Sequence, residues 1–560
     1  MNRSSLTGKV WRIRGEKQSE ESVFSAFCRI RNFSKQDLLP PLLSDLANPQ
    51  SLPGAEASAE RIVQAIKKKE KILIFGDFDL DGMSGSAVLF HALKMIGAHV
   101  RVRLPSRTEG YGLSRTIYEE AKSKKETLVV TVDCGSKCAN AIAFGNELGI
   151  GTIVTDHHTL PEQLPPTVAL LHPHLGNPTD NTWDITGAGV AFFLAFLLLQ
   201  KTFPGKNIDA ILFPLLELAV LGTVADVGKL TGQNRIITHL GILQLQRTKH
   251  PGLKALLASA RIRPEEVNAE AIAFFLAPRL NASGRLARPD ISFELLVGDP
   301  RHSLQYATLL EELNGKRREE TDRLVQLAEQ EIQDEKAPAF CLFREEFFSG
   351  VAGLIAARIA EKYHRPTAIL SRSDRPGFLT ASCRGPDDFH FSDALSELGH
   401  LLERWGGHAA AAGFSIAEEQ FPSFREAFLE LVKKKRGDFP SDPNMEVDCF
   451  LQPEHFFEHD FAEIFSAEPF GAGNNAPLFA LPHITLQETR AVGQDKSHLA
   501  AEIPHKNGKL SCIAFRFAKV LPEPIRNKPL DLLVSPEIRS WQGKQEVRLK
   551  IVDARHPHTE

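Results

Sequence analysis

Three aspartates spaced two residues apart follow a short apolar run early in the chain. The run covers residues 71–76, and Asp77, Asp79 and Asp81 come next, with Gly82 directly after them. Alternate residues of an extended backbone point to one side, so the three carboxylates are expected to share a face. Close anions repel one another, and a divalent cation held by oxygen ligands would neutralise them. Taken alone, the stretch also fits an acidic surface turn, because Asp-Gly is a common turn pair.

Apolar runs end in acidic or histidine residues at three further places. Residues 128–132 precede Asp133, residues 151–155 precede Asp156, His157 and His158, and residues 218–225 precede Asp226. Sites in parallel α/β sheets form beyond the carboxyl ends of the strands, so adjacent strands are expected to gather these groups. Five aspartates with one or two histidines suit two divalent cations, and imidazole beside carboxylate favours Mn²⁺ over Mg²⁺ or Ca²⁺. Two such ions a few ångströms apart are typical of phosphoryl-ester hydrolysis.

The elements around these residues alternate between two hydrophobic patterns. Helix-like spacing covers residues 59–69, 84–96, 115–124 and 138–147, and strand-like runs lie between these segments. Strands that alternate with helices of this length predict an α/β fold with a parallel sheet built from βαβ units.

Three motifs together resemble the DHH phosphoesterase superfamily. They are Asp156-His157-His158, the stretch from Gly76 to Gly82, and Val132-Asp133-Cys134-Gly135. The first motif begins with an aromatic residue and carries another between its first two aspartates, Phe75-Gly76-Asp77-Phe78-Asp79. This form resembles the RecJ-like group, whose members are exonucleases specific for single-stranded DNA.

On this resemblance we expect six residues to hold two ions, either Mn²⁺ or Mg²⁺: Asp77, Asp79, Asp81, Asp133, His157 and Asp226. Asp133 is expected to bridge the ions and to be catalytic together with His158. The latter would contact the phosphate or protonate the leaving 3′ oxygen. Asp156 is expected to orient a neighbouring ligand through a hydrogen bond.

The expected nucleic-acid-binding residues rest on the resemblance too. Without it, Arg107 would be interpreted as a surface arginine and His408 as a core or capping histidine, although a planar guanidinium suits phosphate well. The expected set is Arg107 and Tyr111 in a loop after a strand, Arg279, Asn281, Gly284 and Arg285 in the stretch 277–286, Arg384, Gly407 and His408 in a part similar to DHHA1 domains, and Trp541.

Two features depart from the RecJ-like pattern. His172 occurs where such chains usually carry the Asn of an Asn-Pro pair. The role of His172 and His174 stays open, with a metal-ligand role the less favoured interpretation. The stretch Phe347-Phe348-Ser349-Gly350 lacks the histidine that often precedes this glycine in the group, so any role for that histidine is absent.

We expect five consecutive parts. The first is an N-terminal extension, an arm with a short helix that packs on the domain following it. The tail has β-like runs at 484–487, 499–503, 510–517, 530–534 and 546–552 and many basic residues, which suits an OB-fold barrel. Phe515 and Phe517 are expected in its core, and Trp541 as a stacking platform. The parts are the extension 1–55, a DHH catalytic domain 56–300, a connecting helix 301–336, a DHHA1 domain 337–437 and the OB-like domain 438–560.

The composition is that of an ordinary soluble globular protein. The chain has 560 residues, 42% of them hydrophobic, and a formal charge of −4, so bulk charge gives no signal for nucleic acid. The seven cysteines show no metal-ligand spacing, which fits reduced thiols. No signal-like core opens the chain, and the apolar run 190–199 is too short to cross a bilayer. We expect a cytoplasmic monomer without a membrane partner.

The resemblance implies processive hydrolysis of single-stranded DNA from the 5′ end to nucleotide 5′-monophosphates, in recombination and DNA repair. A helicase and a single-strand-binding protein are the implied partners. One alternative is a DHH/DHHA1 phosphodiesterase for short oligonucleotides or cyclic dinucleotides, which the extra tail disfavours. Another is a non-catalytic replication factor of the same fold, which the complete set of acids and histidines disfavours. The residues alone do not give polarity, RNA activity or the choice between Mn²⁺ and Mg²⁺.

Overall fold

The computed structural model describes residues 5–107, 109–175, 181–407, 409–437, 443–493, 496–506, 508–541 and 544–557. The chain separates into two compact units. The larger unit comprises Pro41–Phe439 and Pro469–Asn474, and the smaller comprises Met1–Pro40, Pro440–Glu468 and Asn475–Glu560. Each unit is described by itself below.

A parallel five-stranded sheet organises the first lobe of the larger unit. Its strand order is β3-β2-β4-β5-β6, and every neighbouring pair is parallel. The strands are β2 (Lys71–Gly76), β3 (His99–Arg103), β4 (Glu126–Val132), β5 (Gly151–Thr155) and β6 (Ala169–Leu171). The α/β fold expected from the alternating pattern is confirmed.

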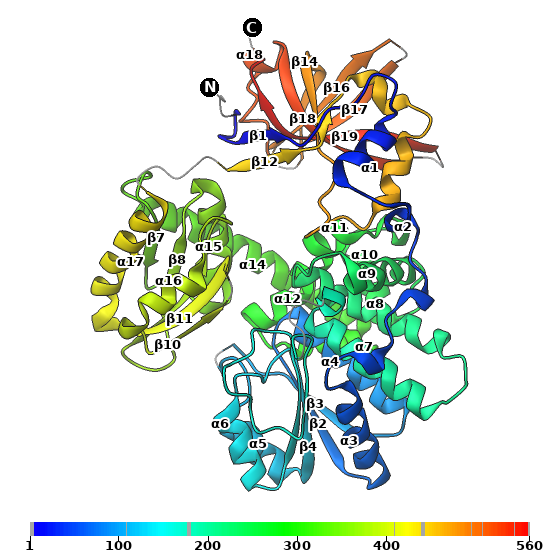
Figure 1. Cartoon of the computed structure of the whole chain (residues 1–560). Helices are drawn as coiled ribbons and strands as arrows, with labels where there is room; N and C mark the ends of the chain where they lie inside the picture. The colour runs from blue at the N-terminus through cyan, green and yellow to red at the C-terminus, as the bar shows by residue number, and fades with distance from the viewer. Residues whose placement is uncertain are drawn as a thin grey trace. The chain divides into compact units, whose positions relative to one another are not determined.

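Both faces of this sheet are buried. Ile72 and Ile74 of β2 point into the main hydrophobic core, whereas Leu73 and Phe75 point into a second one, as the two-residue period of a strand requires. Helices cover the two faces (Figure 1): α5 and α6 pack on the second core, α3 and α4 on the main one. Their bounds are α3 (Ala55–Lys67), α4 (Leu80–Met95), α5 (Arg115–Ser123) and α6 (Ala139–Glu147).

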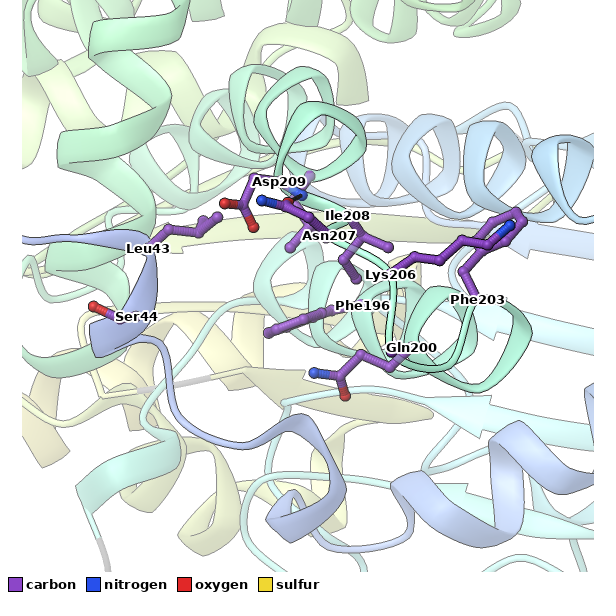
Figure 2. A pocket seen from close by; sticks show the side chains of 11 residues that line it. Leu43, Ser44, Phe196, Gln200, Phe203, Lys206, Asn207, Ile208 and Asp209 are labelled. Atoms are coloured by element: carbon purple, nitrogen blue, oxygen red, sulfur yellow. Dashed lines mark hydrogen bonds between the residues drawn. The ribbon is translucent and has the colours of Figure 1, made fainter.

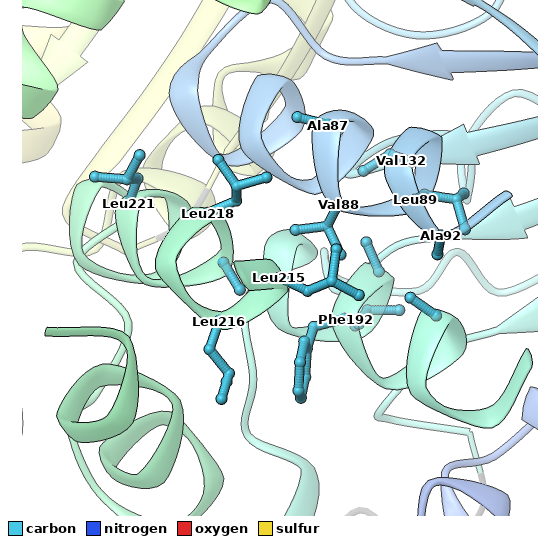
Figure 3. Packing of buried hydrophobic residues seen from close by; sticks show 14 of the residues in the cluster. Ala87, Val88, Leu89, Ala92, Val132, Phe192, Leu215, Leu216, Leu218 and Leu221 are labelled. Carbon is cyan, nitrogen blue, oxygen red and sulfur yellow. The ribbon is translucent and has the colours of Figure 1, made fainter. Parts of the chain in front are cut away.

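Two further helices, α7 (Gly187–Thr202) and α8 (Asp209–Ala225), complete the main core. They pack with α4 through side chains such as Val88, Phe192 and Leu215 (Figure 3). Both helices are apolar around most of their circumference, which is typical of helices buried on all sides.

Two expectations about local structure are wrong. The apolar run before Asp226 is not a strand but the end of α8, because a continuous apolar run does not distinguish a buried strand from a buried helix. The three N-terminal aspartates do not alternate along one strand either. Strand β2 ends at Gly76, and Asp79 is the N-cap residue of α4.

A helical layer and a second lobe follow. The helices are α9 (Gly232–Leu245), α10 (Pro251–Ala260), α11 (Ala269–Ala271), a π-helix (Ile272–Leu276), α12 (Ala277–Leu286), α13 (Asp290–Val297) and the long connecting helix α14 (Ser303–Glu331). The second lobe has a mixed five-stranded sheet in the order β10-β11-β9-β8-β7. Its elements are β7 (Phe340–Phe343), α15 (Ser349–Tyr363), β8 (Thr367–Arg372), β9 (Phe378–Arg384), α16 (Phe391–Glu397), β10 (Arg404–Gly407), β11 (Ala411–Ala417) and α17 (Phe421–Arg436).

The smaller unit contains a seven-stranded sheet in the order β13-β14-β18-β19-β17-β16-β15. The strands are β13 (Cys449–Phe450), β14 (Phe479–Ile484), β15 (Gln487–Val492), β16 (His498–His505), β17 (Gly508–Ala514), β18 (Leu530–Trp541) and β19 (Lys544–Arg555), with α18 (Glu523–Arg526) before β18. The run expected at 484–487 instead spans the turn between β14 and β15. Phe517 is buried as expected, but Phe515 is 46% exposed and therefore not a core residue.

The expected extension 1–55 is divided between the two units: residues 41–55 belong to the larger unit, where Leu46 and Leu52 pack in the main core, and residues 1–40 belong to the smaller one. Strand β1 (Val10–Ile13) pairs in parallel with β12 (Asn444–Val447), and residues 1–40 belong to the smaller unit. Helix α1 (Val23–Arg31) and the short α2 (Lys35–Leu38) also lie there. A pairing partner more than 400 residues away leaves no local signal in the sequence. Among the described residues, no helix is both long and apolar enough to span a membrane.

Candidate metal centre and nucleic-acid site

The turn between β2 and α4 positions the first three aspartates. The Asp79 carboxylate caps α4 by accepting hydrogen bonds from the backbone N–H groups of Asp81 (3.0 Å) and Gly82 (3.2 Å). A Cβ atom at Gly82 would lie 2.6 Å from the Asp77 backbone nitrogen, so only glycine allows the helix to start so close to the strand end. Asp77 therefore ends the strand, and Asp81 lies in the first helical turn.

Asp81 is buried against the N-terminus of α7. Its two carboxylate oxygens accept hydrogen bonds from the backbone N–H groups of Gly187 (2.7 Å) and Ala188 (2.9 Å). A helix N-terminus carries partial positive charge, so it stabilises this anion. Gly222 of α8 packs on the same carboxylate, and a Cβ there would lie 2.6 Å from Asp81 Oδ1.

Asp133 follows β4 in a strained backbone conformation. Its φ angle is 61°, in the left-handed region, and the residue is 2% exposed. Gly187 packs directly on it, since a Cβ at Gly187 would lie 2.6 Å from Asp133 Cβ. The β4–β5 register and the start of α7 thus fix this carboxylate in one place.

His157 lies at the centre of the carboxylates. Its Nε2 atom is 3.0 Å from Asp133 Oδ1, 3.7 Å from Asp81 Oδ2 and 3.7 Å from Asp226 Oδ2. Three sets of side chains have ligand atoms within 4.8 Å of one another: Asp133, His157 and His158; Asp81, His157 and Asp226; and Asp77, Asp79 and Asp133. All six residues expected to hold metal are therefore brought together.

A bound cation would stabilise the ionised form of the clustered carboxylates. Burial and the neighbouring carboxylates raise the pKa of Asp77 to about 8, of Asp81 to about 7 and of Asp226 to about 8, and raise the pKa of Asp133 well above its usual value. Asp77 Oδ1 is buried without a hydrogen-bond partner among the described residues. Carboxylate oxygens with one imidazole are a donor set that fits Mn²⁺ or Mg²⁺.

Asp156 holds His158. Its Oδ1 lies 2.8 Å from His158 Nδ1 and accepts hydrogen bonds from the backbone N–H groups of His157 and His158, while Oδ2 accepts one from Ser136. Burial lowers the pKa of His158, but the bond to Asp156 and the nearby carboxylates outweigh it and raise the pKa to about 9. The Tyr111 hydroxyl donates to the backbone oxygen of Asp133 (3.1 Å) and lies 3.2 Å from the same imidazole nitrogen. The geometry expected of Asp156 is therefore present.

His172 is a scaffold residue in this structure. Its Nε2 donates to the His158 backbone oxygen (2.7 Å), and its Nδ1 accepts from the His174 backbone N–H (3.1 Å). Neither histidine belongs to the metal-ligand groups formed by the described residues.

Three of the expected phosphate-binding arginines meet beside the metal cluster. Arg107 donates to the Gly284 backbone oxygen and stacks on Phe78, Arg285 donates to the Gly350 backbone oxygen, and Arg384 donates to the Cys383 backbone oxygen. Burial and the charges of Arg107, Arg317 and Arg384 lower the pKa of Arg285 to about 9. No ion pair joins these three arginines to a described carboxylate.

The other expected residues have different surroundings. Arg279 forms an ion pair with Glu311 of α14, and Asn281 accepts a hydrogen bond from the Leu80 backbone N–H (2.9 Å). Gly284 packs against the Phe78 backbone oxygen, where a Cβ would be 2.7 Å away, and Gly407 has a φ of 141°. His408 and the Trp541 side chain lie outside the described part of the chain.

Sequence reasoning missed two residues at this site. Phe78, beneath Arg107, was visible as the aromatic residue between Asp77 and Asp79 but received no role. Arg317 of α14 joins the arginines, and nothing in its local sequence separates it from the other charges of that helix.

A pocket of about 540 Å³ lies elsewhere on the larger unit, at the turn between α7 and α8 (Figure 2). Phe196, Phe203 and Leu212 line it together with Lys206 and Asp209. None of its lining residues belongs to the metal cluster, so it is not the catalytic site.

Three family models match consecutive parts of the chain. They are the DHH family N-terminal domain at residues 71–223, the DHHA1 domain at 336–434 and the RecJ OB domain at 447–553. Together with the cluster of acids and histidines, these matches define a metal-dependent enzyme of the DHH class with DHHA1 and OB domains.

Relatives that match along most of this chain identify the family within this class. The single-stranded-DNA-specific exonuclease RecJ of Haemophilus influenzae is 32% identical over 562 residues, which cover 96% of each chain. The RecJ of Escherichia coli is 32% identical and is covered to 90%. The RecJ of Bacillus subtilis is 31% identical, and the match spans 64% of its length. The chain therefore belongs to the RecJ family.

Solved structures agree with this assignment. RecJ from Thermus thermophilus in complex with Mn²⁺ has a TM-score of 0.81 and 28% identity, covering 96% of this chain and 76% of that one. The same protein has also been solved in complex with Mg²⁺, with a TM-score of 0.75.

Proposed function

We propose that this chain is a metal-dependent exonuclease that hydrolyses single-stranded DNA from the 5′ end to nucleotide 5′-monophosphates. One observation carries the proposal: buried carboxylates around His157 lie beside buried arginines that have no carboxylate partner among the described residues. The carboxylates suit divalent cations and the arginines suit phosphate. A phosphodiester bound to two such ions would satisfy both groups at once.

Six residues would hold the ions: Asp77, Asp79, Asp81, Asp133, His157 and Asp226. Two bound divalent cations would supply Lewis-acid chemistry to the scissile phosphodiester. Asp133 and His157 each belong to two of the three ligand groups. Of the two, only the carboxylate has two oxygens to offer, so Asp133 is the residue that would be shared between two ions.

His158 is the proposed proton donor to the leaving group. Asp156 and Tyr111 fix the ring, and the hydrogen bond to Asp156 favours the protonated imidazole. Water adds to the phosphorus and loses a proton to solvent, the bond from phosphorus to the 3′ oxygen breaks, and that oxygen takes a proton from His158, which solvent then restores. The products are a nucleotide with a free 3′ hydroxyl and a strand with a new 5′ phosphate.

Arg107 and Arg285 come from the first lobe of the larger unit and Arg384 from the second. A strand whose phosphates contact all three would pass between the lobes, and we propose that this path admits a single strand but not a duplex. Asn281 supports this track through the turn that carries the aspartates, and Arg279, Gly407, His408 and Trp541 remain proposed contacts. The proposed division of the chain is a DHH catalytic domain at 56–300, a connecting helix at 301–336, a DHHA1 domain at 337–437 and an OB-like domain at 438–560.

The cellular setting is part of the proposal. We infer a cytoplasmic monomer in recombination and in base-excision and mismatch repair. A helicase would supply single strands, and a single-strand-binding protein would present them.

The test is nuclease activity of the full chain and of Asp133→Ala in Mn²⁺. The substrates are a DNA strand labelled at either end, the matched duplex and the matched RNA. Mononucleotides released from the 5′ end of single-stranded DNA by the unmutated protein alone would support the proposal. Turnover restricted to dinucleotides would assign the chain to small substrates instead, and cleavage by Asp133→Ala would contradict the metal assignment.

A further inference from the structure

A fourth arginine of the cluster comes from the connecting helix α14. Arg317 is half-buried, and its Nε atom is buried without a hydrogen-bond partner among the described residues. Its charge is one of those that lower the pKa of Arg285. Helix α14 packs on α12, which carries Arg285, and on α15 of the second lobe.

The same helix neutralises other arginines but not this one. Glu311 of α14 pairs with Arg279, and Asp322 of α14 pairs with Arg358. No ion pair joins Arg317 to a described carboxylate. Its guanidinium is partly desolvated and lies near Arg318, Arg358 and Arg279, and the charge of Asp322 opposes their effect only in part. This arrangement is costly unless an anion binds there.

A second polar group beside Arg317 is also unsatisfied. Asn314 lies three residues earlier on α14, so the two side chains are neighbours on one face of the helix. Asn314 is only 3% exposed, and its Oδ1 atom is buried without a hydrogen-bond partner among the described residues. Unsatisfied buried polar groups are costly. The Nε–H donor and the Oδ1 acceptor are not bonded to each other here, which indicates that the guanidinium takes up another orientation when an anion binds.

We propose that Arg317 binds a backbone phosphate of the single-stranded substrate and that Asn314 is its positioning residue. The phosphate bonds to the outer nitrogens of the Arg317 guanidinium, and Asn314 Oδ1 accepts the Nε–H, which fixes the plane of the guanidinium. The proposal rests on the proposed function. It places one face of the connecting helix in the strand-binding site with Arg285.

The experiment measures equilibrium binding of a fluorescent oligodeoxynucleotide of about 20 residues to the full chain in EDTA, where the strand is not cut. Arg317→Gln is compared with Arg318→Gln, the neighbouring exposed arginine. A lost charge-assisted phosphate contact is expected to weaken binding about tenfold or more. It also reduces the slope of log K against log salt by about 0.7, the value for one phosphate of a single strand. Arg318→Gln is expected to change the affinity less than about twofold.

Asn314→Leu tests the positioning role in a double-mutant cycle. It is expected to weaken binding about fivefold in the parent chain and to have no further effect in Arg317→Gln, because the residue acts only through the guanidinium. Arg317→Lys keeps the charge but not the Nε donor, so it should restore the salt slope and not the affinity.

The inference would be overturned if Arg317→Gln lowered the melting temperature but kept the parental affinity and salt slope. Arg317 would then have a structural role only. The nuclease assay of the unmutated chain separates this from failure of the proposed function. A parent that degrades single-stranded DNA, with Arg317 variants that bind like it, refutes only the role of Arg317. A parent that neither binds nor cuts the strand refutes the proposed function.

Discussion

Asp133 combines three features that oppose folding: a left-handed backbone, nearly complete burial and neighbouring carboxylates. A non-glycine residue with positive φ and a buried anion without a counter-charge each cost free energy. Such a residue persists only where its surroundings determine its position, here through the backbone bond to Thr155 and the close approach of Gly187. This unfavourable free energy is therefore located where two bound cations would offset it.

Tyr111→Phe tests the hydrogen bonds that fix His158. The variant keeps the half-exposed ring but loses the hydroxyl that bonds to the Asp133 backbone oxygen and lies beside the imidazole. One such bond is worth about 1 kcal/mol, so kcat is expected to fall up to about fivefold if the bond orients His158 in the reaction. Because Tyr111 is half-exposed, the melting temperature should fall less than in Tyr118→Phe. Steady-state nuclease kinetics and thermal unfolding measure the two effects.

Tyr118→Phe is the matched control. Its hydroxyl bonds to Thr152 Oγ1 (2.7 Å) in the second core, away from the metal cluster. This variant should lower the melting temperature and spare kcat. The opposite pattern in the two variants would contradict the role given to Tyr111.

At the scale of elements, three of the four acidic segments were predictable. Strands β2, β4 and β5 are short and contain β-branched residues, and Asp77, Asp133 and Asp156 follow directly after them. Their composition and length therefore predicted strands that end where the structure has them. The segment before Asp226 was wrongly assigned because a helix buried on all sides carries the same apolar run. Its C-cap nevertheless brings Asp226 to the same edge of the sheet.

Contacts between distant segments account for what the sequence could not show. Arg317 joins the arginine cluster only because α14 packs on α12 and α15. His172 is held by the backbone of His158, fourteen residues earlier. Both outcomes depend on tertiary packing, which local pattern and spacing do not encode.

Gly222→Ala tests the close approach of α8 to the metal cluster. The added Cβ would lie 2.4 Å from Ser84 Oγ, 2.6 Å from Asp81 Oδ1 and 2.7 Å from Ala188 Cβ. Overpacking of this kind costs about 1–3 kcal/mol, and the displaced Asp81 should also weaken the binding of Mn²⁺. Chemical denaturation and the Mn²⁺-dependent shift in melting temperature measure both effects.

Gly315→Ala provides the matched control within a helix. A Cβ there meets nothing within 4 Å, so the change should stabilise α14 by about 0.5–1 kcal/mol and leave Mn²⁺ binding unchanged. Equal destabilisation by both substitutions would show that packing at Gly222 is not the cause.

Glu217→Gln tests a buried carboxyl group of α8. Burial raises the pKa of Glu217 to about 7, against a weaker opposing effect of the hydrogen bond with Thr248. Between pH 5 and 8 the unfolded chain releases this proton first, so the unmutated protein loses stability as pH rises through that window. The glutamine variant lacks this loss, and its advantage in unfolding free energy should grow by up to about 3 kcal/mol from pH 5 to pH 8. Chemical denaturation of both proteins at pH 5 and at pH 8 measures this difference.

At the scale of the whole molecule, the two ends of the chain build one unit. Residues 1–40 supply β1 and α1 to the unit whose main sheet lies between residues 449 and 555. Trp11 is the central contact of this arrangement. It packs with Val447, Ala480 and Leu533. The N-terminal arm is therefore a structural part of the smaller unit.

Trp11→Ala should destabilise the smaller unit and leave the larger one unchanged. The substitution removes a 7% exposed ring, its hydrogen bond to Asp553 Oδ2 (2.9 Å) and the stacking of Arg555, with an expected cost of about 3–5 kcal/mol. In calorimetry, units with separate cores are expected to unfold in separate transitions, and only one should shift. Gly222→Ala should shift the other transition, and Trp405→Ala, at a 42% exposed site in the larger unit, should shift neither by much. If Trp11→Ala and Gly222→Ala moved one common transition, the two units would unfold together, and residues 1–40 would stabilise the whole chain.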